Sequence, residues 1–429
     1  MEDRQQFQHY PLANGINLYT YQHPFPVCCL ELLLPVGAGH AHAGNNFLPG
    51  SPHFLEHLHL IRSSRYPEAY SLDREIGLKS GHSNGTTYPT TTHYEIDVPS
   101  QELEWACDAL IDRVFHPLFD AEDVKTECGV IRNEREQRKF YPGRSRVSQY
   151  YHTQFLSDVE YPLEQLFGSD EDLRHITPQT LQEMHRRLTS AKDISVLAVG
   201  PSDFSLLRDA LSGLPTENQE FTLSTAPVTW ENPDFRTEYF DTVGQPTLEV
   251  AWVHPRLSYE DFRAVSFIIS LLTNSTHGTL YRELREEKGW TYGIDGFCQQ
   301  RNQNTICGLS FPLNTIEQVD FVREVLAERI QTAIKDQTLV ENEIRRYIGS
   351  QIYGYQTASD IISGASYDLI THGRIYSETE WLAAIERLRN PAYRQQIADR
   401  YFSVEHMGQM LFMPERRTLV PKRELQHDR

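Results

Sequence analysis

The chain contains one pattern of strands and helices twice, and this repeat constrains its fold more than any other feature of the sequence. In each copy an apolar strand-like segment and a polar loop precede a helical pattern, and a second helical segment and another strand-like segment follow. Gly77 of the first copy corresponds to Gly289 of the second, an offset of 212 residues. A chain of 429 residues is long enough for two separate cores. The sequence therefore predicts an α+β fold made of two homologous sandwich domains, each of mixed β-sheet and helices, related by internal duplication.

We expect a turn-rich stretch to join the two units. Residues 212–245 contain Ser-Gly-Leu-Pro and Glu-Asn-Pro-Asp and show no strong periodicity. The predicted boundaries are 1–215 for the N-terminal domain, 216–240 for the linker and 241–429 for the C-terminal domain.

The segment with the clearest chemistry is His53-Phe54-Leu55-Glu56-His57. On a helix, His53 and His57 are one turn apart on the same face, so both imidazoles can reach one tetrahedral cation. Glu56 is then adjacent, where a carboxylate can act as general base toward a metal-activated water. The order H-x-x-E-H is that of the inverzincin helix. Helix-start residues precede the segment: Gly50, Ser51 as N-cap, and Pro52.

A third ligand is expected on the long polar helix that follows Asp120. Glu127 and Glu134 are seven residues apart, so both side chains lie on one face of that helix. Glu134 can complete a two-histidine, one-glutamate site, and Glu127 can orient a histidine from behind. Glu136 lies about 200° around the helix from Glu134 and should point to solvent. A solvated acidic face is the alternative interpretation of these carboxylates.

These segments together resemble the pitrilysin/insulysin zinc peptidases, a family that includes the mitochondrial processing peptidases. In that family a ligand glutamate follows the pentad after 76 intervening residues, and counting from His57 leads to Glu134, with Glu127 at the position of the accessory glutamate. The segment 80–87 and the residues up to Val98 are similar to the part of the family that ends in an edge strand gripping the substrate backbone. The resemblance implies that a peptide adds to this strand and contacts Asn84, Gly85 and Thr86.

The rest of the family signature resembles Leu284 to Tyr292. Family members carry an arginine and a tyrosine seven positions apart, in a later domain that contacts the peptide near the scissile bond. Arg285 and Tyr292 match these positions, and the resemblance implies that they hold the substrate carbonyls and the developing oxyanion. Without the resemblance, Arg285 reads as a solvated helix charge and Tyr292 as a half-buried strand residue.

The second copy of the repeat lacks the metal ligands. At the offset of 212 residues, the positions of the pentad and of the third carboxylate carry Val265, Ile268, Ile269 and Arg346. We therefore expect one Zn²⁺ per chain. Further histidines near the pentad are assigned no metal: His40, His42, His59, His82 and His93.

The composition of the chain limits its possible partners and its cellular location. The formal charge of −19 disfavours binding to nucleic acid and to anionic membranes. The sequence has no apolar run of membrane-spanning length, and its acidic opening resembles neither a signal nor a transit peptide. Six cysteines without a Cys-x-x-Cys pair indicate reduced thiols. We expect a cytoplasmic protein that binds no nucleic acid and no membrane.

The expected function is that of a zinc-dependent endopeptidase which hydrolyses peptides or unfolded segments inside a clamshell chamber. In full-length relatives the arginine–tyrosine segment belongs to the fourth of four homologous domains and faces the first. With two domains here, the resemblance implies a homodimer, or a heterodimer with a sister chain. The alternatives are a subunit of a heterodimeric peptidase of the same family and a non-catalytic core or partner protein. Retention of all five signature residues argues against the non-catalytic alternative.

Overall fold

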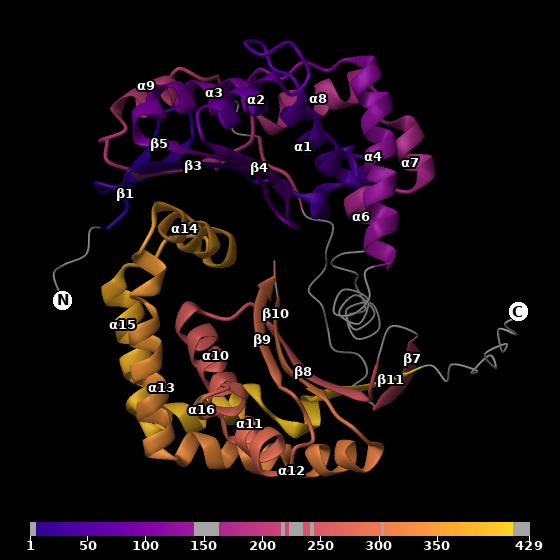
Figure 1. Ribbon diagram of the computed structural model, residues 1–429, viewed down its shortest axis with the longest axis vertical. Helices are drawn as coiled ribbons and strands as arrows, with labels where there is room; N and C mark the ends of the chain where they lie inside the picture. Colours follow the sequence, from indigo (N-terminus) through magenta and orange to yellow (C-terminus); the bar gives the residue numbers. More distant parts are fainter. Residues whose placement is uncertain are drawn as a thin grey trace, which may run out of the picture.

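The computed structural model describes residues 6–140, 163–215, 219–222, 235–240, 244–301 and 304–414. They form two α+β units, one above the other in Figure 1, each with helices against a mixed sheet. None of the six cysteines is in a disulfide. Within the described ranges, no helix combines the length and the apolar character needed to cross a bilayer.

The first sheet has six strands in the order β1-β2-β6-β3-β5-β4. Their bounds are β1 (Gln8–Pro11), β2 (Asn17–Gln22), β3 (Val27–Leu34), β4 (His82–Thr87), β5 (Thr92–Pro99) and β6 (Ser195–Gly200). Strands β2 and β6 run parallel, and the other neighbours are antiparallel. Strand β4 is therefore an edge strand, paired only with β5 among the described residues.

Helices of the first domain cover one face of this sheet (Figure 1). Cys28, Leu30, Leu32 and Leu34, which alternate along β3, point into this core because successive strand side chains face opposite sides. The helices are α1 (Ser51–Ile61), α2 (Ser71–Leu78), α3 (Leu103–Phe115), α4 (Ala121–Phe140), α6 (Leu163–Phe167), α7 (Asp170–His175), α8 (Pro178–Leu188) and α9 (Ser205–Ser212), with the short turns η1 (Ala38–His40), η2 (Ala43–Asn45) and η3 (Ser100–Glu102).

The second sheet has five strands in the order β7-β11-β8-β10-β9. Their bounds are β7 (Arg236–Phe240), β8 (Thr247–Pro255), β9 (Asp295–Arg301), β10 (Asn304–Pro312) and β11 (Gly408–Pro414). The helical elements are α10 (Tyr259–Thr273), α11 (Thr279–Tyr281), the π-helix η4 (Arg282–Glu287), α12 (Ile316–Lys335), α13 (Gln337–Ser350), η5 (Tyr353–Tyr355), α14 (Ala358–His372), α15 (Glu378–Glu386), η6 (Arg387–Arg389), α16 (Pro391–Tyr401) and η7 (Val404–His406).

The order of the strands confirms the internal duplication. The series β2-β6-β3-β5-β4 in the first sheet corresponds, strand by strand in chain order, to β7-β11-β8-β10-β9 in the second. A shift of 212 residues brings the start of β5, Thr92, onto the start of β10, Asn304. The copies differ most before the first long helix, because residues 35–50 separate β3 from α1 whereas residues 256–258 join β8 to α10.

The predicted linker, residues 216–240, overlaps the second sheet. Strand β7 lies inside this range and pairs in parallel with β11, so the second sheet begins before residue 241. Residues 216–218 and 223–234 of the predicted linker lie outside the described residues. Strand β7 could not be predicted from the local sequence, because its partner β11 is the last strand of the domain, more than 160 residues further along the chain.

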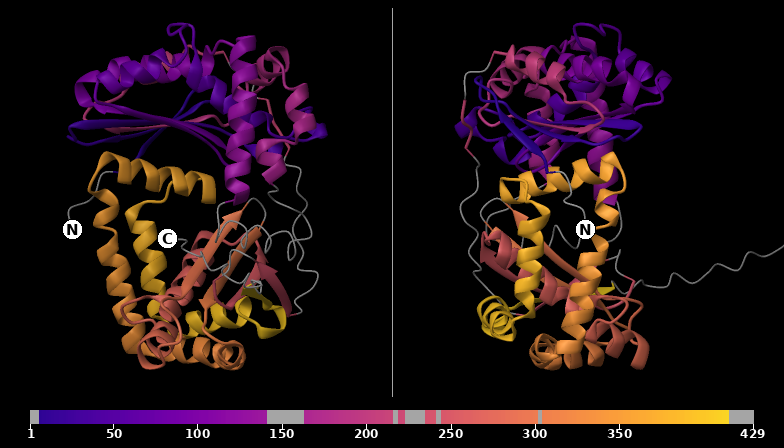
Figure 2. Two further views of the ribbon diagram at one scale, coloured as in Figure 1. Left: turned by 45° about the vertical axis from the view of Figure 1, so that its right-hand side comes forward. Right: turned by 90° about the vertical axis from the view of Figure 1, so that its left-hand side faces the viewer.

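Helix α14 of the second domain lies against the first sheet (Figures 1 and 2). The helix packs on the sheet face opposite the first domain's own helices. Apolar residues of α14, of β3 and of β6 share this cluster: Ala358, Ile361, Ile362, Ala365, Cys29, Leu33, Leu197 and Val199. Because both faces of β3 are covered here, every residue of that strand is apolar except Glu31.

Candidate metal centre

The pentad lies on α1, as the sequence predicts, and a glycine fixes where that helix begins. Gly50 is the N-cap residue, with a φ of 83°. A Cβ on Gly50 would lie 2.6 Å from the backbone of Phe167 and Gly168, so only glycine fits against the end of α6. Ser51, expected to be the N-cap, is instead the first helical residue, and its hydroxyl donates to the carbonyl oxygen of Leu48.

Helices α1 and α4 bring three ligand atoms together. Nε2 of His53 and Nε2 of His57 are 3.3 Å apart. Oε2 of Glu134 is 3.6 Å from each of these nitrogens. A tetrahedral zinc ion with bonds of about 2.0–2.1 Å holds its ligand atoms about 3.3–3.4 Å apart. Among the described residues this is the one group of three histidine, cysteine or acidic side chains that could hold an ion, and two imidazoles with one carboxylate suit Zn²⁺.

Glu127 contacts His57 at Nδ1, the ring nitrogen that does not face the metal position, as the spacing along α4 predicts. Its Oε2 lies 2.9 Å from Nδ1 of His57, and its Oε1 accepts a hydrogen bond of 3.0 Å from the hydroxyl of Tyr70. Because an ionised carboxylate can only accept, Nδ1 of His57 carries the hydrogen. In the neutral imidazole, the form that binds a metal, Nε2 of His57 is then the nitrogen with the lone pair, and it faces Glu134.

The surroundings of His57 favour positive charge. Burial lowers the pKa of His57, but the hydrogen bonds of Glu127 and Glu134 and the charge of Glu56 raise it by more, to about 9. The field that favours a proton on this imidazole also favours a divalent cation between the ligands. The charge of the site therefore agrees with the geometry of its ligand atoms.

Glu56 faces the edge strand. Its Oε2 accepts a hydrogen bond of 2.8 Å from the hydroxyl of Thr87 on β4. The side chain is buried, and this burial raises the pKa of Glu56, opposed by His57 and by the bond from Thr87. A Cβ on Gly85 would lie 2.9 Å from Oε1 of Glu56, so the backbone of β4 passes directly over the carboxylate.

The three residues expected to bind substrate lie on this edge strand. Asn84 is exposed, and its Nδ2 lies 3.4 Å from Oγ1 of Thr86. In the described part of the chain no strand pairs with the outer side of β4, so its backbone groups are available to an added strand. The sequence placed Thr87 in the substrate-binding segment but did not predict its contact with Glu56, and it gave no signal for Tyr70. Strand pairing and helix packing bring these two residues to the site, and no local spacing indicates such contacts.

Arg285 and Tyr292 lie together but belong to the second domain. The Arg285 guanidinium is 5.2 Å from the centroid of the Tyr292 ring. Tyr292 is 86% exposed and lies in the turn before β9, not in a strand. Helix α11, which leads directly into the π-helix that carries Arg285, lies at the bottom of Figure 1, whereas α1 lies at the top. The described structure of one chain therefore does not bring these two side chains to the His53 group.

The second copy carries apolar side chains at the positions of the pentad. Val265, Ile268 and Ile269 are buried in α10, at the offset of the pentad. Arg346 on α13 forms an ion pair of 2.7 Å with the buried Glu343. The repeat thus retains the fold and loses the ligands, as the sequence predicts.

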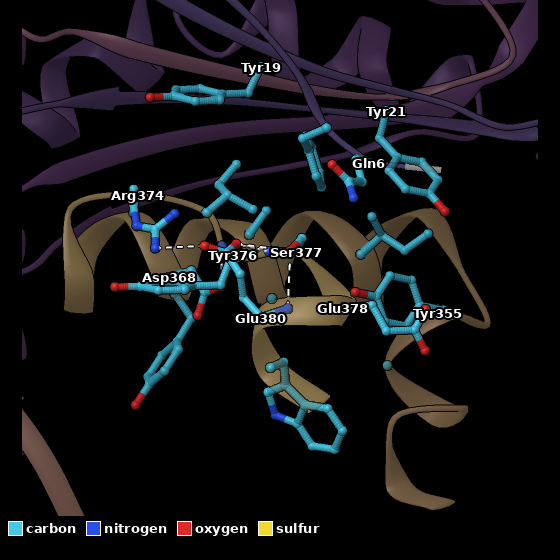
Figure 3. Close-up of a pocket in the computed structure, with 18 of the residues that line it drawn as sticks. Gln6, Tyr19, Tyr21, Tyr355, Asp368, Arg374, Tyr376, Ser377, Glu378 and Glu380 are labelled. Carbon is cyan, nitrogen blue, oxygen red and sulfur yellow. Dashed lines mark hydrogen bonds and ion pairs between the residues drawn. The ribbon is translucent and has the colours of Figure 1, made fainter. Parts of the chain in front are cut away.

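Two cavities lie where the domains meet. One of about 640 Å³ lies between β2 and the second domain, where Arg374 forms an ion pair of 2.8 Å with Glu380. Figure 3 shows the rings of Tyr19, Tyr21 and Tyr355 around it. The other, of about 940 Å³, lies beside the turn between β4 and β5, and its lining includes Thr86. Neither is lined by His53, His57 or Glu134.

Comparison with known families identifies the chain. Residues 21–165 match the model of the insulinase family, Peptidase family M16, and residues 175–348 match the Peptidase M16 inactive domain. Together the two matches cover well over half of the chain. The chain belongs to the M16 peptidase family. The inactive-domain match includes the part of the second copy in which Val265, Ile268 and Ile269 replace the pentad.

Relatives of this M16 chain differ in length. Insulin-degrading enzyme-like 2 of Arabidopsis thaliana is 21% identical over 424 residues, which cover 92% of this chain and 42% of the relative. The uncharacterized zinc protease YmxG of Bacillus subtilis is 22% identical over 368 residues, which cover 82% of this chain and 86% of the relative. The crystal structure of a protease from Helicobacter pylori superposes with a TM-score of 0.79 at 16% identity, over 95% of this chain and 99% of the other. The chain thus spans less than half of the Arabidopsis relative and most of the two bacterial proteins.

Proposed function

We propose that this M16 peptidase is a zinc-dependent endopeptidase that hydrolyses peptides or unfolded segments. The observation that supports it most is the placement of three ligand atoms within 3.6 Å of one another. A buried carboxylate, Glu56, stands beside them under an edge strand. This combination supplies a metal position, a base and a place for an extended peptide.

His53, His57 and Glu134 would hold one Zn²⁺ per chain, with Glu127 keeping His57 in the tautomer that presents Nε2. When bound, the ion supplies Lewis acidity, which polarises a peptide carbonyl and makes a water more acidic. Glu56 takes the proton of the attacking water and later delivers it to the leaving amine. The burial that raises the pKa of Glu56 strengthens it as a proton acceptor.

The edge strand accounts for the class of substrate. A peptide can add to β4 only if its own backbone donors and acceptors are free, so an extended or unfolded segment is preferred over a folded one. Asn84, Gly85 and Thr86 would line this added strand. Gly85 leaves the space in which Glu56 lies next to the strand.

Glu56→Gln tests the function. The variant should retain zinc, because no ligand changes, and should lose cleavage of a fluorogenic peptide by several orders of magnitude. Glu136→Gln is the matched control, because Glu136 is a carboxylate on α4 whose side chain is 48% exposed; it should cleave like the wild type. Full activity of Glu56→Gln in zinc-loaded protein would overturn the assignment of the base.

We propose that a second copy of the chain supplies Arg285 and Tyr292 to each site, giving a homodimer with two sites. One observation supports this: the π-helix that carries Arg285 follows α11, which lies at the opposite end of the chain from α1 in Figure 1. A heterodimer with a sister chain would meet the same need. The expected cytoplasmic location stays a prediction from the sequence.

Complementation tests the shared site. Glu56→Gln and Arg285→Ala should each be inactive alone. After subunit exchange, half of the sites in a mixed dimer combine an intact pentad with an intact arginine, so activity should return. If exchange is demonstrated by mass spectrometry and no activity returns, Arg285 acts within its own chain.

A further inference from the structure

The two domains of one chain are joined by a buried polar contact that leads toward the candidate base. We infer that Ser366, Glu31 and His93 are positioning residues, through which the second domain of the same chain holds the β4–β5 turn and, with it, Thr87 against Glu56. The expected effect of these residues on turnover rests on the proposed peptidase function. Their restraint of the β4–β5 turn does not depend on that function.

Glu31 is the centre of this contact. It is the only residue of β3 that is not apolar, it is 7% exposed, and its side chain lies on the sheet face covered by α14. Oε1 of Glu31 lies 2.5 Å from Nδ1 of His93 and accepts a hydrogen bond of 2.9 Å from the hydroxyl of Ser366 on α14. A buried carboxylate is costly unless donors satisfy it, so the three side chains restrain one another strongly.

His93 passes this restraint to the turn between β4 and β5. An ionised Glu31 can only accept, so Nδ1 of His93 carries the hydrogen, and Nε2 of His93 forms a hydrogen bond of 2.9 Å with the hydroxyl of Thr91. The His93 ring also packs against the ring of Tyr88, with centroids 4.6 Å apart. Tyr88 and Thr91 close the turn through a backbone hydrogen bond of 2.8 Å. Both ends of the turn are thus held by one imidazole.

The β4–β5 turn sets the position of Thr87, the residue that contacts the candidate base Glu56. Thr87 directly precedes Tyr88, and its hydroxyl donates to Oε2 of Glu56. The backbone of the turn is anchored on its other side by Ala38 and Gly39, whose amides donate to the carbonyls of residues 88 and 89. His93 is the contact on the side of the turn that faces the second domain, so we expect a shift of His93 to alter the position of Thr87 against Glu56. The three metal ligands lie on α1 and α4 and should stay in place.

Alternatively, Ser366 could serve only to hold α14 against the first sheet. Apolar residues on three successive turns of the same helix already provide that docking, among them Ile361, Ile362 and Ala365. The two roles predict different effects of removing the Ser366 hydroxyl. If Ser366 only holds α14 on the sheet, the thermal stability of the protein falls and kcat is unchanged. If Ser366 positions the β4–β5 turn, kcat falls with little change in KM or zinc content.

The test compares Ser366→Ala with Ser363→Ala, one turn earlier on α14 and exposed to solvent. Amide hydrogen exchange of residues 84–92 and kcat with KM are measured on zinc-loaded full-length protein. A hydrogen bond to a buried charged group is worth about a tenfold change in an equilibrium, so Ser366→Ala should raise exchange in the turn and lower kcat by roughly tenfold each. Ser363→Ala should match the wild type, and Ser366→Thr, which keeps a hydroxyl, should restore both quantities.

Equal exchange in Ser366→Ala and Ser363→Ala would overturn the inference. So would faster exchange with an unchanged kcat, because the turn would then be uncoupled from the base. If no variant and no wild-type sample cleaves peptide, the proposed function fails, while the exchange measurement still decides whether Ser366 holds the turn.

Discussion

Gly85→Ala tests how closely the edge strand passes over the candidate base. An added Cβ would lie 2.9 Å from Oε1 and 3.0 Å from Cγ of Glu56, whereas ordinary contacts of this kind begin near 3.4 Å. Glu56 cannot move away freely, because it is buried and Thr87 holds its other oxygen. A misplacement approaching 1 Å at a reacting group costs on the order of 100-fold in rate. We therefore expect kcat to fall by about 10- to 100-fold, with zinc content unchanged, because no ligand is displaced.

The assay is cleavage of a fluorogenic peptide, with metal content and thermal unfolding measured on the same samples. Gly77→Ala on α2 is the control, because an added Cβ there meets nothing within 4 Å; it should leave kcat unchanged. In a Glu56→Gln background, Gly85→Ala should cost nothing further, since both changes act on one carboxylate. Unchanged kcat in Gly85→Ala would refute the steric argument, and an equal loss in the Glu56→Gln background would show that Gly85 acts elsewhere.

Three further outcomes are expected. Glu127→Gln should weaken zinc affinity by roughly 10- to 100-fold, because His57 loses the partner that fixes its tautomer; chelator competition measures this, and an unchanged affinity would contradict it. Glu134→Gln should lose zinc, and metal analysis showing a full equivalent would place the third ligand on another residue. Burial lowers the pKa of His40 to about 4 from its ordinary 6.5. The unfolded chain therefore binds this proton more readily, so the contribution of His40 to stability is complete above about pH 6.5 and is lost as the pH falls toward 4. His40→Asn should flatten the decline of Tm across that window, and an equally steep decline would assign the acid sensitivity to other groups.

The sequence by itself determined the parts of this protein that depend on local geometry and on repetition. His53 and His57 share a helix face because four residues make about one turn, whatever surrounds them. The duplication was readable because both copies keep the same order of strands and helices, and the loss of ligands in the second copy was visible at Val265 and Ile268. Glu134 needed the family spacing in addition, since the spacing of Glu127 and Glu134 places both on one face of α4 without choosing the ligand.

Only the tertiary structure decided which residues from distant segments meet. Strand pairing placed Thr87 and Gly85 beside Glu56, and domain docking placed Ser366 beside Glu31, 335 residues earlier in the chain. The same dependence on a distant partner hid β7 within the predicted linker. Such contacts leave no periodic signal, because hydrogen bonds between separate strands and helices depend on register and docking, and these are set by the packing of the whole core.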